Sequence, residues 1–285
     1  MNERKYEVLL ASVIAARATS FIFSKMLLLS MSRFNLLAVR FLLAFILLSL
    51  IFCKRLKRMT RETFFAGVIM GTLYFIVMAL ELTALRVADS SLISLLENTA
   101  IIIVPILEAV ILRALPKKLE IICAIIAMTG VLCLSAQHGF MSGGVVLGLL
   151  AALFYSFAIV ATGSLAHRTN DSLCSGIIQV GTLGVFSLIA SLFTEEFIFP
   201  TGAREWGMLL MLAIVCTGFG YTLQPVAQSH VSVERTGLFC SINPAIATLL
   251  GVLVLHEKIG ILGIVGLVLI IFSIALPYIR IKKSA

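Results

Sequence analysis

Apolar stretches of about twenty residues, repeated along nearly the whole chain, constrain the fold more than any other feature. A helix that crosses the hydrocarbon core of a bilayer needs about 20 mostly apolar residues. Ten such stretches occur in the 285 residues, at approximately 6–30, 35–53, 63–86, 90–113, 119–136, 144–165, 173–194, 206–228, 235–255 and 260–279. We therefore predict an all-α integral membrane protein with ten transmembrane helices.

Composition excludes a soluble globular fold. Hydrophobic residues make up 60% of the chain and charged residues only 13%, which leaves too few charged side chains to cover a water-exposed surface. The first stretch is too long for a secretory signal peptide and lacks a small-residue cleavage site, so we expect it to remain as a membrane span.

The lysines and arginines predict how the chain is oriented. With the N-terminus in the cytoplasm, fifteen of the 22 lie at cytoplasmic ends of the predicted spans, and four, Arg33, Arg86, Arg204 and Lys258, lie at outer ends. Cytoplasmic loops of membrane proteins are enriched in Lys and Arg. The sequence therefore predicts a protein of the cytoplasmic membrane with both termini in the cytoplasm. Its basic residues are expected to contact lipid headgroups rather than nucleic acid.

The second half of the chain follows the pattern of the first. Residues 235–277 match residues 92–134 at a shift of 143 positions, and the same shift aligns Glu81 with Gln224, each a polar residue in an apolar stretch. Five spans in each half is an odd number, so the halves must cross the membrane in opposite directions. Inverted repeats are typical of secondary transporters, with the solute site between them. We therefore predict two inverted five-helix repeats, residues 1–138 and 139–285.

Residue patterns for catalysis or cofactor binding are missing from the sequence. The six cysteines form no CxxC pair, and the four histidines form no HExxH grouping, so neither a metal site nor another cofactor is expected. There is also no P-loop GxxxxGK[ST] of an ATP-driven motor. A membrane-embedded enzyme acting on a lipid-linked substrate would need clustered Asp and His residues or a nucleophile–base pair. We expect a protein that is not an enzyme, and keep such an enzyme as the alternative from another class.

Several motifs point to a known family. The run TGLFCSINPAIATLLGVLVLHE, from Thr236 to Glu257, has a small-residue start, a mid-helix proline and a closing His-Glu turn. In this it resembles a late helix of the EamA branch of the drug/metabolite transporter superfamily. The run from Gln224 to Gln228 resembles the paired glutamines in the eighth helix of one EamA subgroup, and Arg40 resembles the arginine that opens the family's second helix. Arg17 stands where the family usually has a tryptophan. The resemblance covers essentially the whole chain and implies secondary transport, often export, of amino acids, other metabolites or drugs.

Charged side chains inside the predicted spans are the first candidates for a solute site. They are Arg17, Lys25, Arg40, Glu81 and Glu97. An ion in the bilayer core costs about 2.5–3.5 kcal/mol or more, so each is expected to face a partner or a wet cavity within the bundle. At a rise of about 1.5 Å per residue, Glu97 and Arg40 lie at similar depths, roughly 10 Å below the outer ends of their helices.

Two interpretations are open for these charges. Arg40 and Glu97 could form a buried ion pair that joins two helices. Alternatively, Arg40 could bind a substrate carboxylate while Glu97 binds an amine or a proton. Glu81 could reach the outer interface or pair with Lys25. It could also take part in transport, because its repeat mate Gln224 shows that a polar group fits at this position.

Uncharged polar residues within the spans complete the candidate site. They are Asn98, Tyr74, Tyr155, Gln224 and Asn243, and their hydrogen-bonding groups would either join helices or bind the solute. Asn243 precedes a proline, which leaves a carbonyl one turn earlier without its donor. Such broken helices often line cavities.

Together these patterns predict a secondary active transporter of a small polar metabolite, such as an amino acid or a related zwitterion or cation. It would work by alternating access, coupled through Glu81 or Glu97 to a proton, or to a counter-substrate. A multidrug or organic-cation exporter of the same fold is the alternative within this class. The sequence leaves open the direction of transport, the coupling ion and whether protomers pair as a homodimer.

Overall fold

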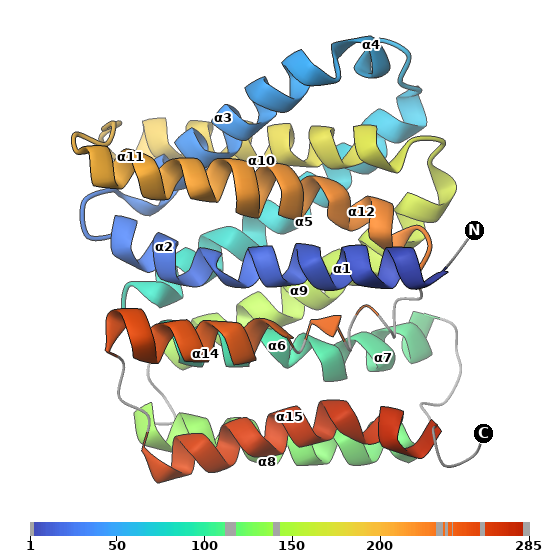
Figure 1. The fold of residues 1–285 in the computed structure, drawn as a ribbon, viewed down its shortest axis with the longest axis vertical. Coiled ribbons are helices and arrows are strands. Elements are labelled where there is room, and N and C mark those ends of the chain that lie inside the picture. The colour runs from blue at the N-terminus through green and yellow to red at the C-terminus, as the bar shows by residue number, and fades with distance from the viewer. Residues whose placement is uncertain are drawn as a thin grey trace.

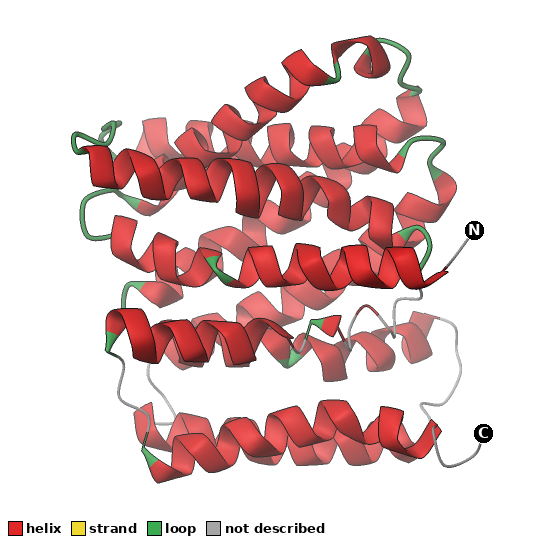
Figure 2. Cartoon of the chain, viewed as in Figure 1, coloured by secondary structure: helices red, strands yellow, loops and turns green. Residues whose placement is uncertain are grey.

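The structure is a computed structural model that describes residues 3–111, 118–138, 143–231, 236, 239–240, 242–256 and 260–281. Every regular element in these residues is a helix (Figure 2). The elements are α1 (Glu3–Ala18), α2 (Ser20–Leu27), α3 (Arg33–Ile51), α4 (Cys53–Leu56), α5 (Arg61–Leu85), α6 (Ser90–Asn98), α7 (Ala100–Ile111), α8 (Lys118–His138), α9 (Gly143–Arg168), α10 (Ser172–Thr194), α11 (Ala203–Leu210), the π-helix η1 (Met211–Tyr221), α12 (Thr222–Gln228), α14 (Ile242–Leu255) and α15 (Ile261–Ile281). Helix α1 begins on the side of the molecule on which α15 ends (Figure 1).

Six helical stretches in the described residues are long and apolar enough to cross a membrane. They are Lys5–Leu27, Arg33–Ile51, Arg61–Leu85, Gly143–Arg168, Ser172–Thr194 and Ala203–Gln228. Two shorter apolar stretches, Leu92–Leu107 and Ile261–Ser273, accompany them. These findings confirm the all-helical fold for the described residues and are compatible with a multi-pass membrane protein, while the count of ten spans stays a prediction.

The distribution of side chains is the reverse of that in a water-soluble protein. Large apolar side chains lie on the surface, with Phe193 86% and Ile261 82% exposed, whereas Arg40 and Glu81 inside the bundle are 1% and 2% exposed. An apolar surface is stable where lipid surrounds the helices. Charged side chains avoid that lipid by lying inside the bundle, where they can find a partner or a cavity. The exterior therefore faces lipid.

The helices stack in successive layers (Figure 1). Helices α8 and α15 pack along each other at one end of the molecule, and α14 packs on α6 in the next layer. Helix α1 lies between α14 and η1, while α10 packs against α3, α5 and α12. Residues from both halves of the sequence thus alternate through the bundle.

Helices α3 and α10 are joined at both ends. At one end, a Glu195 carboxylate oxygen accepts hydrogen bonds from the backbone N–H groups of Phe34 and Asn35, each 3.0 Å long, and so caps the first turn of α3. At the other end, Asp171 caps α10 and accepts a 2.5 Å hydrogen bond from Arg55 Nε, in the short α4 that follows α3.

The Asp171 carboxylate is held in its ionised form by these contacts. Burial alone would raise its pKa, but the hydrogen bonds from Arg55 and from the backbone of Cys174 lower the pKa below its ordinary value of 3.8. Because the pKa of Asp171 is lower in the folded state than in the unfolded chain, the pair stabilises the fold at pH values above the ordinary pKa. The contribution is lost as the pH falls through the lowered pKa.

Glycines allow α10 to approach its neighbours closely. A Cβ atom on Gly176 would lie 2.3 Å from the backbone oxygen of Thr222, and one on Gly184 would lie 3.0 Å from the backbone nitrogen of Leu42. Small residues at helix contacts allow van der Waals packing in membranes, where the hydrophobic effect does not drive helices together.

We expect Gly176→Ala to destabilise the protein, since the added methyl group must push α12 away from α10. Overpacking of this kind costs about 1–3 kcal/mol, which should lower the melting temperature in detergent by several degrees. Gly207→Ala is the matched control, because a Cβ there meets nothing within 4 Å and alanine favours the helix. Equal melting temperatures for the two variants would contradict the close α10–α12 contact.

Some predicted features lie outside the described residues. The proposed boundary between the repeats adjoins residues 139–142, which are among these. Five of the fifteen basic residues predicted at cytoplasmic ends, Arg113, Lys117, Arg235, Lys282 and Lys283, also lie outside, as does Lys258 at a predicted outer end.

Candidate functional site

Two helix interruptions place charged side chains in the bundle. The break between α1 and α2 is at Thr19, two residues after Arg17, and the break between α6 and α7 is at Thr99, two residues after Glu97. In both places the threonine hydroxyl donates to the carbonyl three residues earlier, at 2.8 Å and 2.7 Å respectively. A third irregularity, η1, contributes further residues described below, and such π-helical turns often occur at functional sites.

Arg17 lies in a cage of three tyrosines. Its guanidinium donates to the hydroxyls of Tyr155 and Tyr221, at 3.3 Å and 3.1 Å, and to the side-chain oxygen of Gln224. The same guanidinium lies 4.1 Å from the ring centre of Tyr221 and 5.5 Å from that of Tyr74. Gln224 donates in turn to the Tyr74 hydroxyl at 2.8 Å. The cage therefore draws residues from α5, α9, η1 and α12 around one cation.

A glycine makes room for this arginine. A Cβ atom on Gly220, in η1, would lie 2.7 Å from Cγ of Arg17. The bare backbone at this position lets the apolar stem of Arg17 pass η1 and its charged end reach the cage.

Arg40 lies beside the cage. Its Nε donates to the Thr217 hydroxyl at 2.7 Å, and its guanidinium lies 5.9 Å from the Tyr221 ring centre. In the part of the chain that the structure describes, neither Arg40 nor Arg17 forms an ion pair with a carboxylate. The structure thus does not form the Arg40–Glu97 pair that the sequence allowed.

Glu81 and Glu97 face each other instead. The two carboxyl groups interact electrostatically, and the charges of Arg17 and Arg40 also act on Glu81 through space. Both glutamates are buried. Two acidic side chains buried in one region of the bundle are candidates to carry a proton between them.

The interior contains hydrogen-bonding capacity that the described helices do not use. Several buried polar side chains have atoms without a partner in the described structure: Arg17 Nε, Arg40 Nη2, Glu97 Oε2, both amide atoms of Asn98, Gln179 and Gln228, and Asn243 Oδ1. Native proteins satisfy almost all such groups, so a concentration of exceptions needs an explanation. A polar ligand in the bundle would use them.

Lys25 lies apart from these residues. Its ammonium group is 3.3 Å from an Asp89 carboxylate oxygen and donates to the Ala88 carbonyl at 3.1 Å. It does not pair with Glu81 among the contacts that the structure describes. The sequence prediction that included Lys25 in the solute site stays untested, but this geometry places it at the turn before α6.

The candidate site predicted from the sequence did not include Tyr221 and Thr217, which contact Arg17 and Arg40 respectively. Tyr221 precedes Gln224 by three residues and so shares its helix face, which was a usable signal. The shift of 143 positions also pairs Tyr74 with Thr217 and Met78 with Tyr221. The Tyr221 hydroxyl lies 3.3 Å from the Met78 sulfur, so these two repeat mates are in contact.

Comparison with known proteins identifies the family. The profile of the EamA-like transporter family matches residues 5–136 and again residues 142–279. The chain is 24% identical to the uncharacterized transporter YetK of Bacillus subtilis (strain 168), over 97% of this chain and 87% of that protein. A solved crystal structure shares the fold, with a TM-score of 0.69 at 18% identity over 96% of this chain and 98% of that chain. These matches confirm the resemblance seen in the motifs, and the chain belongs to the EamA-like transporter family.

Proposed function

We propose that this protein is a secondary active transporter that moves a small polar metabolite, an amino acid or a related zwitterion or cation, across the cytoplasmic membrane. Family membership indicates membrane transport. The solute site in this proposal is the cluster of Arg17, Arg40, Glu81 and Glu97 together with the tyrosine cage. Alternating access would expose the cluster to each side of the membrane in turn.

The observation that carries the proposal is the burial of four charged side chains whose polar atoms are only partly paired. Charged groups inside a membrane protein are costly and mark the paths of ions and solutes. A purely structural set would be expected to satisfy its own hydrogen bonds, because a half-satisfied buried network is destabilising. Here Arg40 Nη2 and Glu97 Oε2 have no partner among the described residues.

The chemistry of the cluster favours a zwitterion. Guanidinium groups such as those of Arg17 and Arg40 bind carboxylates through forked donors. The Glu81–Glu97 pair can accept from an ammonium group or hold a proton. A solute with both a carboxylate and an amine would match both halves of the cluster.

Helix packing supports the predicted inverted repeats, residues 1–138 and 139–285. If the chain repeats after five spans, three of the five mate pairs are α3 with α10, α6 with α14, and α8 with α15. Each of these pairs is in contact, as expected around a pseudo-two-fold axis between the halves.

Counterflow in proteoliposomes tests the proposal. Liposomes preloaded with an unlabelled amino acid should take up the labelled compound well above protein-free liposomes, and the triple variant Glu81→Gln, Glu97→Gln, Arg40→Ala should fall to background. The exposed Glu196→Gln is the matched control and should behave as wild type. Exchange unchanged in the triple variant would contradict the site.

The tyrosine cage supports the alternative function of an organic-cation exporter. Three aromatic rings around a guanidinium form an environment suited to cations. A ligand cation would have to displace Arg17 from the cage. Counterflow of quaternary ammonium compounds, with no exchange of amino acids, would favour this alternative.

A further inference from the structure

A cavity lies away from the solute site, at the side of the bundle on which α1 begins and α15 ends (Figure 1). It has a volume of about 410 Å³ and is formed by residues 54–63, which include the end of α4 and the start of α5, and by the connection between α9 and α10. In the predicted orientation this is the cytoplasmic surface.

The lining of the cavity is basic. Lys54, Arg55 and Arg58 line it together with one carboxylate, that of Asp171. The Asp171 carboxylate already accepts hydrogen bonds from Arg55 and from the backbone N–H groups at the start of α10. In the described residues neither Lys54 nor Arg58 has an ion-pair partner. The cavity therefore has a surplus of positive charge.

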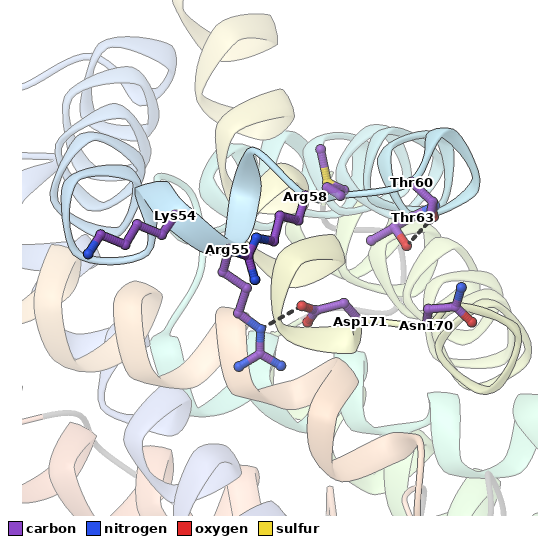
Figure 3. A pocket seen from close by; sticks show the side chains of 8 residues that line it. Lys54, Arg55, Arg58, Thr60, Thr63, Asn170 and Asp171 are labelled. Carbon is purple, nitrogen blue, oxygen red and sulfur yellow. Dashed lines mark hydrogen bonds and ion pairs between the residues drawn. The ribbon is translucent and has the colours of Figure 1, made fainter.

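Neutral donors extend this basic surface. Figure 3 shows Arg55 and Arg58 on the side of the cavity nearest Asp171, with Lys54 directed outward and Thr60, Thr63 and Asn170 on the other side. The Arg55–Asp171 hydrogen bond uses only Nε of the guanidinium, which leaves its terminal nitrogens as further donors. Guanidinium, hydroxyl and amide groups around one cavity suit a phosphate.

Exposed apolar residues flank the cavity on both sides in sequence. Leu50 and Ile51 end α3 just before the basic segment, and Phe64 and Phe65 follow it in α5; all four side chains are exposed. In a membrane protein such side chains face acyl chains. A free phosphate would use only the cations, whereas a phospholipid would use the cations and the apolar flanks.

We propose that this cavity binds the phosphate-bearing headgroup of an anionic phospholipid in the adjacent leaflet. Arg58 supplies positive charge inside the cavity, Lys54 adds to it from the outer edge, and the acyl chains lie along the exposed residues of α3 and α5. Anionic lipids attract basic groups at the membrane surface, and basic pockets between helices bind their headgroups. Because residues of both predicted repeats line the cavity, a bound lipid stabilises the arrangement in which Arg55 contacts Asp171.

Native mass spectrometry of the purified full chain tests this proposal. With phosphatidylglycerol added to the detergent micelles, we expect the wild type to retain the lipid and Lys54→Gln, Arg58→Gln to retain about tenfold less. Both side chains are exposed, so the variant should keep its helical content and melting temperature in phosphatidylcholine. Arg55 is left unchanged because its loss would break the ion pair with Asp171.

The matched control is Arg86→Gln, Arg204→Gln, which removes two exposed arginines from the other side of the bundle. It should retain phosphatidylglycerol as the wild type does. Equal retention by the Lys54, Arg58 variant and this control would overturn the proposal, and so would equal retention of phosphatidylcholine and phosphatidylglycerol by the wild type. Displacement of the lipid by millimolar inorganic phosphate would assign the cavity to a soluble phosphate and also overturn it. The readout is binding, so it is independent of which solute the protein transports.

Discussion

Replacing Arg17 with glutamine is expected to reduce solute exchange by about a hundredfold while changing the melting temperature little. Loss of a buried charged partner typically costs about 2–5 kcal/mol of binding, and each 1.4 kcal/mol is about tenfold. Arg17 is expected to contribute less to the free energy of unfolding than to solute binding. Its guanidinium is buried without a carboxylate partner in the described structure, so its desolvation cost offsets its hydrogen bonds. The glutamine amide can still donate to Gln224 or to a tyrosine.

Proteoliposome counterflow and thermal unfolding of the same preparation measure the two effects separately. Arg86→Gln, an exposed arginine, is the matched control and should leave both unchanged. Arg17→Lys keeps the charge without the forked donors and should fall between the wild type and Arg17→Gln. A large loss of stability with exchange still intact would show that Arg17 only joins helices.

Replacing both Glu81 and Glu97 with glutamine is expected to abolish proton movement linked to the solute. A proton carried by these two carboxyl groups, as proposed, has no site in the double variant, because an amide does not titrate. A pH-sensitive dye inside the proteoliposomes, read while a solute gradient drives transport, measures protons moved per solute. The expected ratio is at background in the double variant and clearly above it in the wild type.

Glu196→Gln is again the control for charge removal, and it should keep the wild-type ratio. Each single variant retains one carboxyl group and should move fewer protons per solute than the wild type. Proton movement that persists undiminished in the double variant would rule out coupling through this pair. Solute transport without proton movement in the wild type would instead favour exchange for a counter-substrate.

The positions of the helices could be predicted from the sequence because membrane insertion depends on local apolar length. The stretches predicted at 63–86 and 173–194 correspond to Arg61–Leu85 and Ser172–Thr194. The interruptions at Thr19 and Thr99 and the π-helix η1 were not predicted. Each lies within an apolar run, and a threonine hydroxyl that bonds to the backbone of its own helix leaves no signal in hydropathy.

The sequence predicts which residues form the candidate site better than it predicts which of them are in contact. Charge inside a span is visible in the sequence, and Arg17, Arg40, Glu81 and Glu97 are all buried. Which groups meet depends on the rotation of each helix about its axis and on its neighbours. A one-dimensional pattern therefore could not show that Arg40 contacts Thr217 or that Lys25 contacts Asp89.

The contacts at both ends of the α3–α10 pair limit the motions that the protein can make. Glu195 accepts hydrogen bonds at the start of α3, and Asp171 pairs with Arg55 in α4, the helix that follows α3. The two helices α3 and α10 should therefore move as one rigid unit. One comes from each half of the sequence, which means that neither half can swing freely on its own. In a transport cycle by alternating access, this pair of helices would serve as a pivot common to both halves, and the other helices would tilt about it.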